Sequence, residues 1–134
     1  KRMVMGMFVS FKRQENHAYL FGALASLGDR HDILLVLVGD TLVDDHEDTL
    51  TYKREVQTSL ESLGLADRIQ VLGNRTDVEK IYPACDFTVL PSHREGTPNV
   101  VLESMACGVP AIVTDVSDNA LLVADQQRAL VPRE

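Results

Sequence analysis

The chain has 134 residues, of which 45% are hydrophobic and 25% are charged, and its formal net charge at pH 7 is −7. This length and composition predict one globular domain with its own core. The negative charge disfavours a dedicated nucleic-acid binder, because a polyanionic partner would be repelled. We therefore expect a small-molecule partner. We find no apolar run near the about 20 residues that cross a bilayer and no secretory leader.

The two cysteines, Cys85 and Cys107, lie among apolar residues at the start of an expected strand and the end of an expected helix. Their spacing matches no zinc or redox motif, so we expect two buried free thiols. Free thiols favour a reducing compartment.

Strands and helices are expected to alternate in the first half of the chain. Residues 2–9 and 32–39 are apolar runs, and the second is continuous, which is typical of a central strand that is covered on both faces. Asn16 is expected to cap a helix over residues 17–27. A second helix, with apolar residues at helical spacing, is expected to end at Gly64.

The second half continues this alternation. Residues 68–72 predict a third strand, and Thr76 with Glu79 forms a capping box for a short helix. Because the connections are too long for hairpins, the strands should be parallel with helices on both faces. We therefore expect a doubly wound, Rossmann-like α/β domain with a parallel sheet of about six strands. The remaining strands are expected at residues 87–90, 109–114 and 129–131.

The strand at residues 87–90 leads into the most informative stretch, residues 93–108. Thr97 is a good helix N-cap, and Pro98 fits the first helical position. The next three backbone amides would have no partner within the helix and would point outward with the positive end of its dipole, as in an anion site. These amides belong to Asn99, Val100 and Val101.

Two carboxylates flank this helix start, because Glu95 lies just before it and Glu103 in its second turn. A diphosphate linked to a sugar and a ribose would suit the layout, and Gly96 lets a ligand approach the main chain. In a doubly wound sheet the ligand crevice lies outside the carboxyl ends of the strands. A capped helix with solvated glutamates remains the alternative. The loops expected at this rim are residues 10–15, 39–40, 73–75, 92–99 and 115–119.

Other site motifs are absent from the sequence. We find no G-x-G-x-x-G after the first strand and no phosphate-binding P-loop, which disfavours dinucleotide binding of the Rossmann type and P-loop chemistry. We also find no G-x-S-x-G nucleophile elbow and no H-x-x-x-H metal pair.

The stretch E-G-T-P-N-V-V-L-E at residues 95–103, with Ser92 before it and M-A-C-G-V-P after it, resembles the E-x7-E region of family 4 glycosyltransferases of the GT-B fold. The resemblance extends over nearly the whole chain. It includes further blocks at residues 11–17, 38–40, 71–78 and 113–116.

The resemblance implies the carboxyl-terminal, nucleotide-sugar-binding domain of a retaining glycosyltransferase that uses a UDP- or GDP-sugar to build a polysaccharide, lipopolysaccharide or glycolipid. It implies that Glu95 is the catalytic residue beside the reacting carbon and that Glu103 holds the ribose hydroxyls. It implies neither a metal nor a cofactor beyond the nucleotide-sugar co-substrate. The donor-binding residues so implied are Ser10, Lys12, Arg13, Gly73, Asn74, Arg75, Ser92, Gly96, Thr97, Pro98, Asn99, Val100, Val101 and Glu103.

The amino-terminal domain, which takes the acceptor in this family, is absent from the sequence. The isolated domain is therefore expected to bind the donor and not to transfer the sugar. The resemblance also implies a cytoplasmic location, with contact to the inner face of the membrane made through the absent domain.

Two positions depart from the family pattern, which usually has an Arg and, five residues on, a Lys, both directed at the donor diphosphate. Our alignment places Ser10 and Glu15 there, whereas a shifted alignment would place Met7 and Lys12 there but lose a better match downstream. On the preferred alignment, Ser10→Arg with Glu15→Lys is expected to tighten nucleotide binding. The candidate replacement cations are Lys12, Arg13 and Arg94.

Two alternatives stay open. The first is a noncatalytic or degenerate interaction domain that keeps the α/β scaffold without its ligand, and the two departures favour it. The second is a sugar-nucleotide epimerase of the GT-B fold. An acidic receiver domain is excluded, because no cluster of aspartates follows the first strand.

Overall fold

The computed structural model describes residues 2–30, 32–42, 47–93, 99–114 and 129–131. These residues form a six-stranded sheet with the order β3-β2-β1-β4-β5-β6, in which every neighbouring pair is parallel. This is the doubly wound strand order, and the expected fold is confirmed. The strands are β1 (Met3–Phe8), β2 (Ile33–Val38), β3 (Ile69–Gly73), β4 (Phe87–Leu90), β5 (Ala111–Thr114) and β6 (Ala129–Val131).

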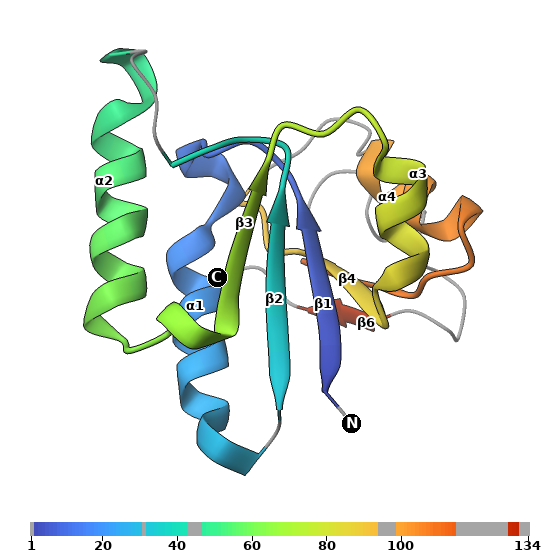
Figure 1. Ribbon diagram of the computed structural model, residues 1–134, viewed down its shortest axis with the longest axis horizontal. Coiled ribbons are helices and arrows are strands. Elements are labelled where there is room, and N and C mark those ends of the chain that lie inside the picture. Colours follow the sequence, from blue (N-terminus) through green and yellow to red (C-terminus); the bar gives the residue numbers. More distant parts are fainter. Residues whose placement is uncertain (1, 31, 43–46, 94–98, 115–128, 132–134) are drawn as a thin grey trace.

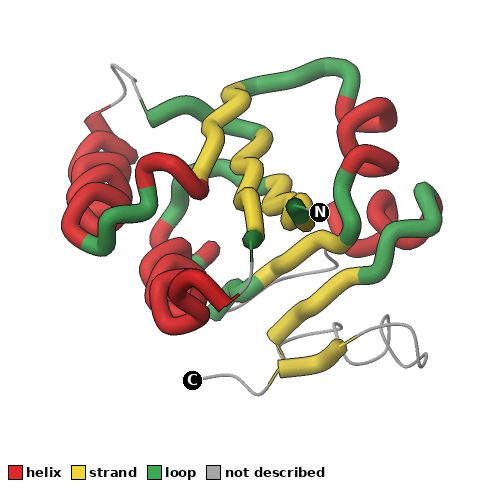
Figure 2. The backbone as a smooth tube through the Cα atoms, turned by 60° about the horizontal axis from the view of Figure 1, so that its bottom comes forward, coloured by secondary structure: helices red, strands yellow, loops and turns green. Residues whose placement is uncertain are grey.

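Helices cover both faces of the sheet. Figure 1 shows α1 and α2 on one face and α3 and α4 on the other, and Figure 2 shows the sheet between these two layers. The helices are α1 (His17–Leu27), α2 (Glu47–Ser62), α3 (Val78–Ile81) and α4 (Asn99–Ala106). No helix within the described ranges is both long enough and apolar enough to cross a bilayer.

The position of β2 in the sheet explains why its sequence is apolar without interruption. Leu35 and Leu37 pack into the core cluster under α1 and α2, whereas Val36 and Val38 pack into a second cluster on the opposite face with Tyr82. Successive side chains of a strand point to opposite faces, so a strand covered twice needs apolar residues at every position. This placement confirms the expectation of a central strand.

Three local predictions need correction. Asn16 is at the N-cap of α1 in a left-handed conformation with φ 62°, but its side chain makes no capping hydrogen bond. The capping box is also wrong, because Asp77 rather than Thr76 is the N-cap of α3. Cys85 is a buried free thiol as expected, whereas Cys107 is only half-buried.

Candidate functional site

The strand order places the switch point between β1 and β4, because α1 covers one face next to β1 and α4 covers the other next to β4. A ligand crevice is expected outside the carboxyl ends of these two strands. The loop after β1 contains the 3-10 turn Arg13–Glu15, and the loop after β4 begins at Pro91. These two loops flank the position at which the crevice is expected.

Hydrogen bonds join the two loops although they are far apart in sequence. The backbone N–H of His93 donates to the carbonyl of Gln14 at 2.8 Å, and Nδ2 of Asn16 donates to the carbonyl of Pro91 at 3.2 Å. This contact is why the Asn16 side chain is not a helix cap. Backbone carbonyls and amides that are paired in this way hold the loops in a fixed relation.

Ser92 is the centre of a third connection. Its side chain is buried, and its hydroxyl donates to Oε2 of Glu15 at 3.0 Å. Its carbonyl accepts a hydrogen bond of 2.7 Å from the hydroxyl of Thr114, at the end of β5. The loops after β1 and β4 and the end of β5 are therefore linked, and Glu15 is a buried side chain rather than a solvated one.

Asp40, directly after β2 and Gly39, stabilises the start of the loop that follows β1. Its Oδ2 accepts from the backbone N–H of Phe11 at 3.0 Å, and its Oδ1 accepts from the buried ammonium of Lys53 at 3.1 Å. Burial alone would raise the pKa of Asp40, but the amides of Phe11 and Thr41 and the Lys53 contacts outweigh it and lower that pKa. The loop after β1 is thus held by an ionised carboxylate.

His17, the first residue of α1, lies beneath the same loop. Its side chain is 1% exposed, and the Tyr52 hydroxyl lies 2.8 Å from Nδ1 and 3.2 Å from the backbone nitrogen of His17. The hydroxyl accepts from that N–H and also forms a hydrogen bond with Nδ1, in which the tautomer of the ring decides the donor. Among the residues that the structure describes, none forms a hydrogen bond with Nε2. Burial lowers the pKa of His17 to about 4.

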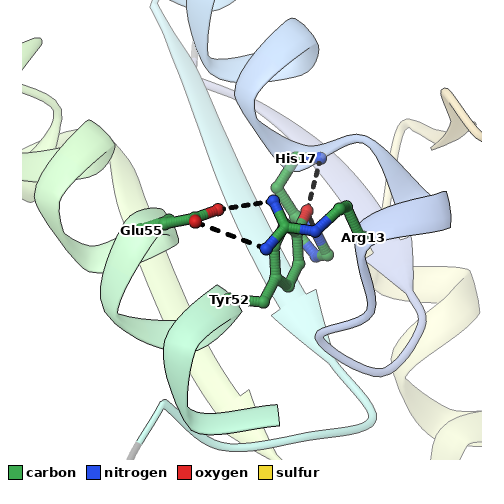
Figure 3. Close-up of polar contacts among 4 residues, drawn as sticks. All are labelled: Arg13, His17, Tyr52 and Glu55. Carbon is green, nitrogen blue, oxygen red and sulfur yellow. Dashed lines mark hydrogen bonds and ion pairs between the residues drawn. The ribbon is translucent and has the colours of Figure 1, made fainter.

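Arg13 is paired with helix α2. Its guanidinium forms two hydrogen bonds with the carboxylate of Glu55, at 2.7 and 3.3 Å, and lies 5.2 Å from the centre of the Tyr52 ring (Figure 3). The hydrogen bond to Glu55 raises the pKa of the arginine. In this conformation Arg13 is directed toward α2, and reaching a ligand at the switch point would require breaking an exposed ion pair, which costs little.

Helix α4 presents Glu103 in its second turn. Oε2 of Glu103 accepts a hydrogen bond of 2.8 Å from the hydroxyl of Tyr82. The Tyr82 ring is buried and stacks on Phe8 with ring centres 3.9 Å apart, so the hydroxyl is fixed from the sheet side. Burial, followed by the hydrogen bond to Glu103, raises the pKa of Tyr82 well above its ordinary value.

The structure describes five further residues that were expected to bind the donor, and they lie in the loop after β1, at the end of β3 and in the loop after β3. Ser10 is half-buried after β1, and Lys12 is exposed. Arg75 is paired with Asp77 at 2.8 Å. Gly73 has φ 74°, a left-handed conformation that favours glycine, and Asn74 beside it is exposed. Among the described side chains, no group of three His, Cys, Asp or Glu could hold a metal ion.

The first turn of α4 contains the three residues whose amides were expected to bind an anion: Asn99, Val100 and Val101. Val101 is buried against the sheet, and Asn99 is exposed. The preceding segment, residues 94–98, lies outside the described residues, as do residues 115–119 of the expected rim. The predicted site residues in that segment are Glu95, Gly96, Thr97 and Pro98.

Sequence reasoning missed three contributors to this region: the Glu15–Ser92 contact, the Asp40–Lys53 pair and Tyr82. Each depends on residues far apart in the chain, and no spacing rule links them. The available signals were charged residues at positions that the fold buries. Lys53, for example, has the helical spacing of the buried face of α2, three residues before Val56.

Comparison with known protein families supplies independent information. The family model described as "Glycosyl transferases group 1" matches residues 2–134. An Escherichia coli protein named UDP-Gal:alpha-D-GlcNAc-diphosphoundecaprenol alpha-1,3-galactosyltransferase is 36% identical over 96 residues, covering 71% of this chain and 22% of that protein. The lipopolysaccharide glucosyltransferase WaaG of Escherichia coli K12 is 30% identical over 105 residues, covering 77% of this chain and 25% of that protein.

Solved structures show the same fold as this chain. The crystal structure of Anabaena HepE in complex with UDP-glucose superposes with a TM-score of 0.87 at 27% identity, covering 99% of this chain and 35% of that one. The chain therefore spans about a fifth to a third of these relatives. Both sequence relatives are named as transferases, which favours a transferase over the epimerase alternative.

Proposed function

Because the chain belongs to the group 1 glycosyl transferases of the GT-B fold, we propose that it is the donor-binding domain of a retaining, metal-independent enzyme that takes a UDP- or GDP-sugar. One observation carries this proposal. At the switch point of a parallel sheet, hydrogen bonds join the loop after β1 to the loop after β4, which leads in sequence to helix α4, and the second turn of α4 presents the carboxylate of Glu103.

The chemistry that this arrangement supports is departure of a nucleoside diphosphate. Negative charge grows on the diphosphate as its bond to the sugar breaks, and fixed backbone amides at a helix start stabilise such charge without reorganising. The amides at the start of α4 would supply this stabilisation. Glu95 would lie beside the sugar, where a carboxylate orients hydroxyls or stabilises the positive charge of an oxocarbenium-like carbon.

Binding of the acceptor would depend on a part of the protein that corresponds to the unmatched region of the relatives. We propose that an amino-terminal domain binds the acceptor and closes over the donor. The names of the two Escherichia coli relatives support a lipid-linked or lipopolysaccharide acceptor. We also propose that a hexose is transferred, and the two names support this because both describe transfer of a hexose.

The test is calorimetric titration of the chain with UDP, GDP and ADP. We expect heat of binding with UDP or GDP at micromolar to millimolar concentration, and the Glu103→Ala variant should bind more weakly. A matched control is Glu61→Ala, which removes an exposed glutamate from helix α2, away from Glu103. Absence of binding by all three nucleotides at millimolar concentration would overturn the proposal.

That outcome would support the noncatalytic alternative. One observation favours it: Glu15, at the position where the family usually has a cation, is a buried carboxylate. A carboxylate near a diphosphate opposes binding, and a missing cation about 4 Å from a phosphate forfeits about 4 kcal/mol at an effective dielectric of about 20. The titration decides between the two functions, because an interaction domain would bind none of the nucleotides.

A further inference from the structure

A hydrogen bond between Tyr82 and Glu103 holds the carboxylate of Glu103 in one orientation. A carboxylate can only accept hydrogen bonds, so the Tyr82 hydroxyl is the donor in the 2.8 Å bond to Oε2. The same hydroxyl lies 3.5 Å from the carbonyl of Val100, at the limit of a hydrogen bond, so its one proton is directed to Glu103. The side chain of Glu103 is held by this one strong contact.

Tyr82 is a rigid support for such a contact. Its ring is 1% exposed, lies in the core cluster behind β1 and β2, and is nearly parallel to the ring of Phe8, with 17° between their planes. Burial and the hydrogen bond to Glu103 raise the pKa of Tyr82, so its hydroxyl is protonated at neutral pH. Glu103 itself is exposed on α4, where an unsupported glutamate would sample many rotamers.

The contact leaves Glu103 available to a ligand. In the part of the chain that the structure describes, its second oxygen, Oε1, makes no hydrogen bond. Glu103 is exposed on α4 and borders a hollow of about 240 Å³ between α3 and α4 that is lined by apolar atoms. A carboxylate with one oxygen tethered retains enough lone pairs to accept hydrogen bonds from two vicinal hydroxyls.

We propose that Tyr82 is a positioning residue that fixes the carboxylate of Glu103 for the ribose hydroxyls of the donor nucleotide, an inference that rests on the proposed function. Tethering removes rotamer freedom before the ligand arrives, and preorganisation of this kind improves affinity by lowering the entropy lost on binding. Tyr82 thereby sets the preference for a ribonucleotide over one that lacks the ribose hydroxyls.

The test compares UDP with 2′,3′-dideoxy-UDP, and GDP with its dideoxy form, by calorimetry. The wild-type chain should bind the ribose form about tenfold more tightly, the ratio expected for hydrogen bonds to a charged group. Tyr82→Phe keeps the buried ring and removes only the hydroxyl, so it should reduce this ratio to about threefold while the affinity for the dideoxy form stays unchanged. Tyr19→Phe, which removes an exposed hydroxyl on α1, should keep the wild-type ratio.

A double-mutant cycle separates positioning from a merely structural effect. Glu103→Gln should abolish the ribose preference, and Tyr82→Phe in that background should have no further effect. Equal weakening of both nucleotide forms by Tyr82→Phe, or an unreduced ribose preference, would overturn the role of Tyr82. Wild-type binding without any ribose preference would also overturn it, while leaving donor binding intact. No binding of either base would instead refute the proposed function itself.

Discussion

The hydroxyl of Ser92 donates a 3.0 Å hydrogen bond to the buried carboxylate of Glu15 and so fastens the loop after β4 to the loop after β1. The two residues are 77 positions apart. The loop that contains Ser92 leads directly to the start of α4, so this contact bears on the orientation of the proposed donor site. Its removal should affect stability and binding together.

Ser92→Ala should lower the free energy of unfolding by about 1–3 kcal/mol, because it leaves a buried carboxylate with one hydrogen bond fewer. Nucleotide affinity should fall as well, since the loop before α4 loses a support. Urea denaturation and calorimetry measure the two effects. Ser26→Ala is the matched control on the exposed side of α1, where we expect a change within about 0.5 kcal/mol. A Ser92 variant as stable as this control would contradict the role of the contact.

Because of the contact between Glu15 and Ser92, we expect different effects from two substitutions that the sequence alone suggests making together. Ser10→Arg adds a cation at a half-buried position after β1 and should tighten nucleotide binding. Glu15→Lys, in contrast, replaces the acceptor of the Ser92 hydrogen bond with a buried cation and should destabilise the fold by about 3 kcal/mol. We therefore expect the single Ser10→Arg variant to bind more tightly than the double variant. Calorimetry at fixed salt measures this, and tighter binding by the double variant would show that Glu15 faces the diphosphate.

His17 predicts a defined pH dependence of stability. Its folded pKa of about 4 is below the ordinary value of 6.5, so the unfolded chain takes up the proton first as the pH falls. The stabilising contribution is fully present above pH 6.5 and is lost as the pH approaches 4, with a total of about 3 kcal/mol. Urea denaturation at several pH values should show this loss, and His17→Leu should remove it.

Tyr52→Phe is the informative comparison for this prediction. Burial is the first cause of the lowered pKa of His17, and it survives loss of the tyrosine hydroxyl. The Tyr52 variant should therefore be less stable at neutral pH but keep most of the slope between pH 6.5 and 4. A slope that disappears in Tyr52→Phe would mean that the hydrogen bond, and not burial, controls the protonation of His17.

The fold was readable from the sequence because its signals are local. The uninterrupted apolar run of β2, the breaker at Pro91 after β4 and the stop at Gly108, which has φ 72°, each depend on neighbouring residues only. The order of the strands in the sheet, in contrast, comes from the structure and was not predicted. Asn16 shows where this reasoning fails: its type suits a helix cap, but a carbonyl brought near by the fold takes its side chain instead.

The position of the donor site stays a prediction from residue order, whereas the contacts that support its neighbouring loops could not be predicted at all. Loops at the carboxyl ends of strands and a helix start with glutamates on either side can be recognised from residue order. The partners of these groups cannot, because Tyr82 reaches Glu103 only after β1, α3 and α4 have packed together. Buried polar pairs of this kind depend on tertiary geometry, and their residue types are equally suited to solvated surfaces.

Substitutions at two glycines test how tightly the residues around Phe8 and Tyr82 are packed. A Cβ at Gly6 would lie 2.7 Å from both Sγ of Cys85 and Cε1 of Phe8, whereas a Cβ at Gly22 meets nothing within 4 Å. Gly22→Ala should stabilise the chain by about 1 kcal/mol, because alanine is the better residue inside helix α1. Gly6→Ala should destabilise it by about 1–3 kcal/mol through overpacking. Because Phe8 stacks on Tyr82, Gly6→Ala should also reduce the preference for the ribose form of the nucleotide. Urea denaturation with paired nucleotide titrations measures both effects, and a neutral Gly6→Ala would show that the Phe8 ring moves without disturbing the tyrosine.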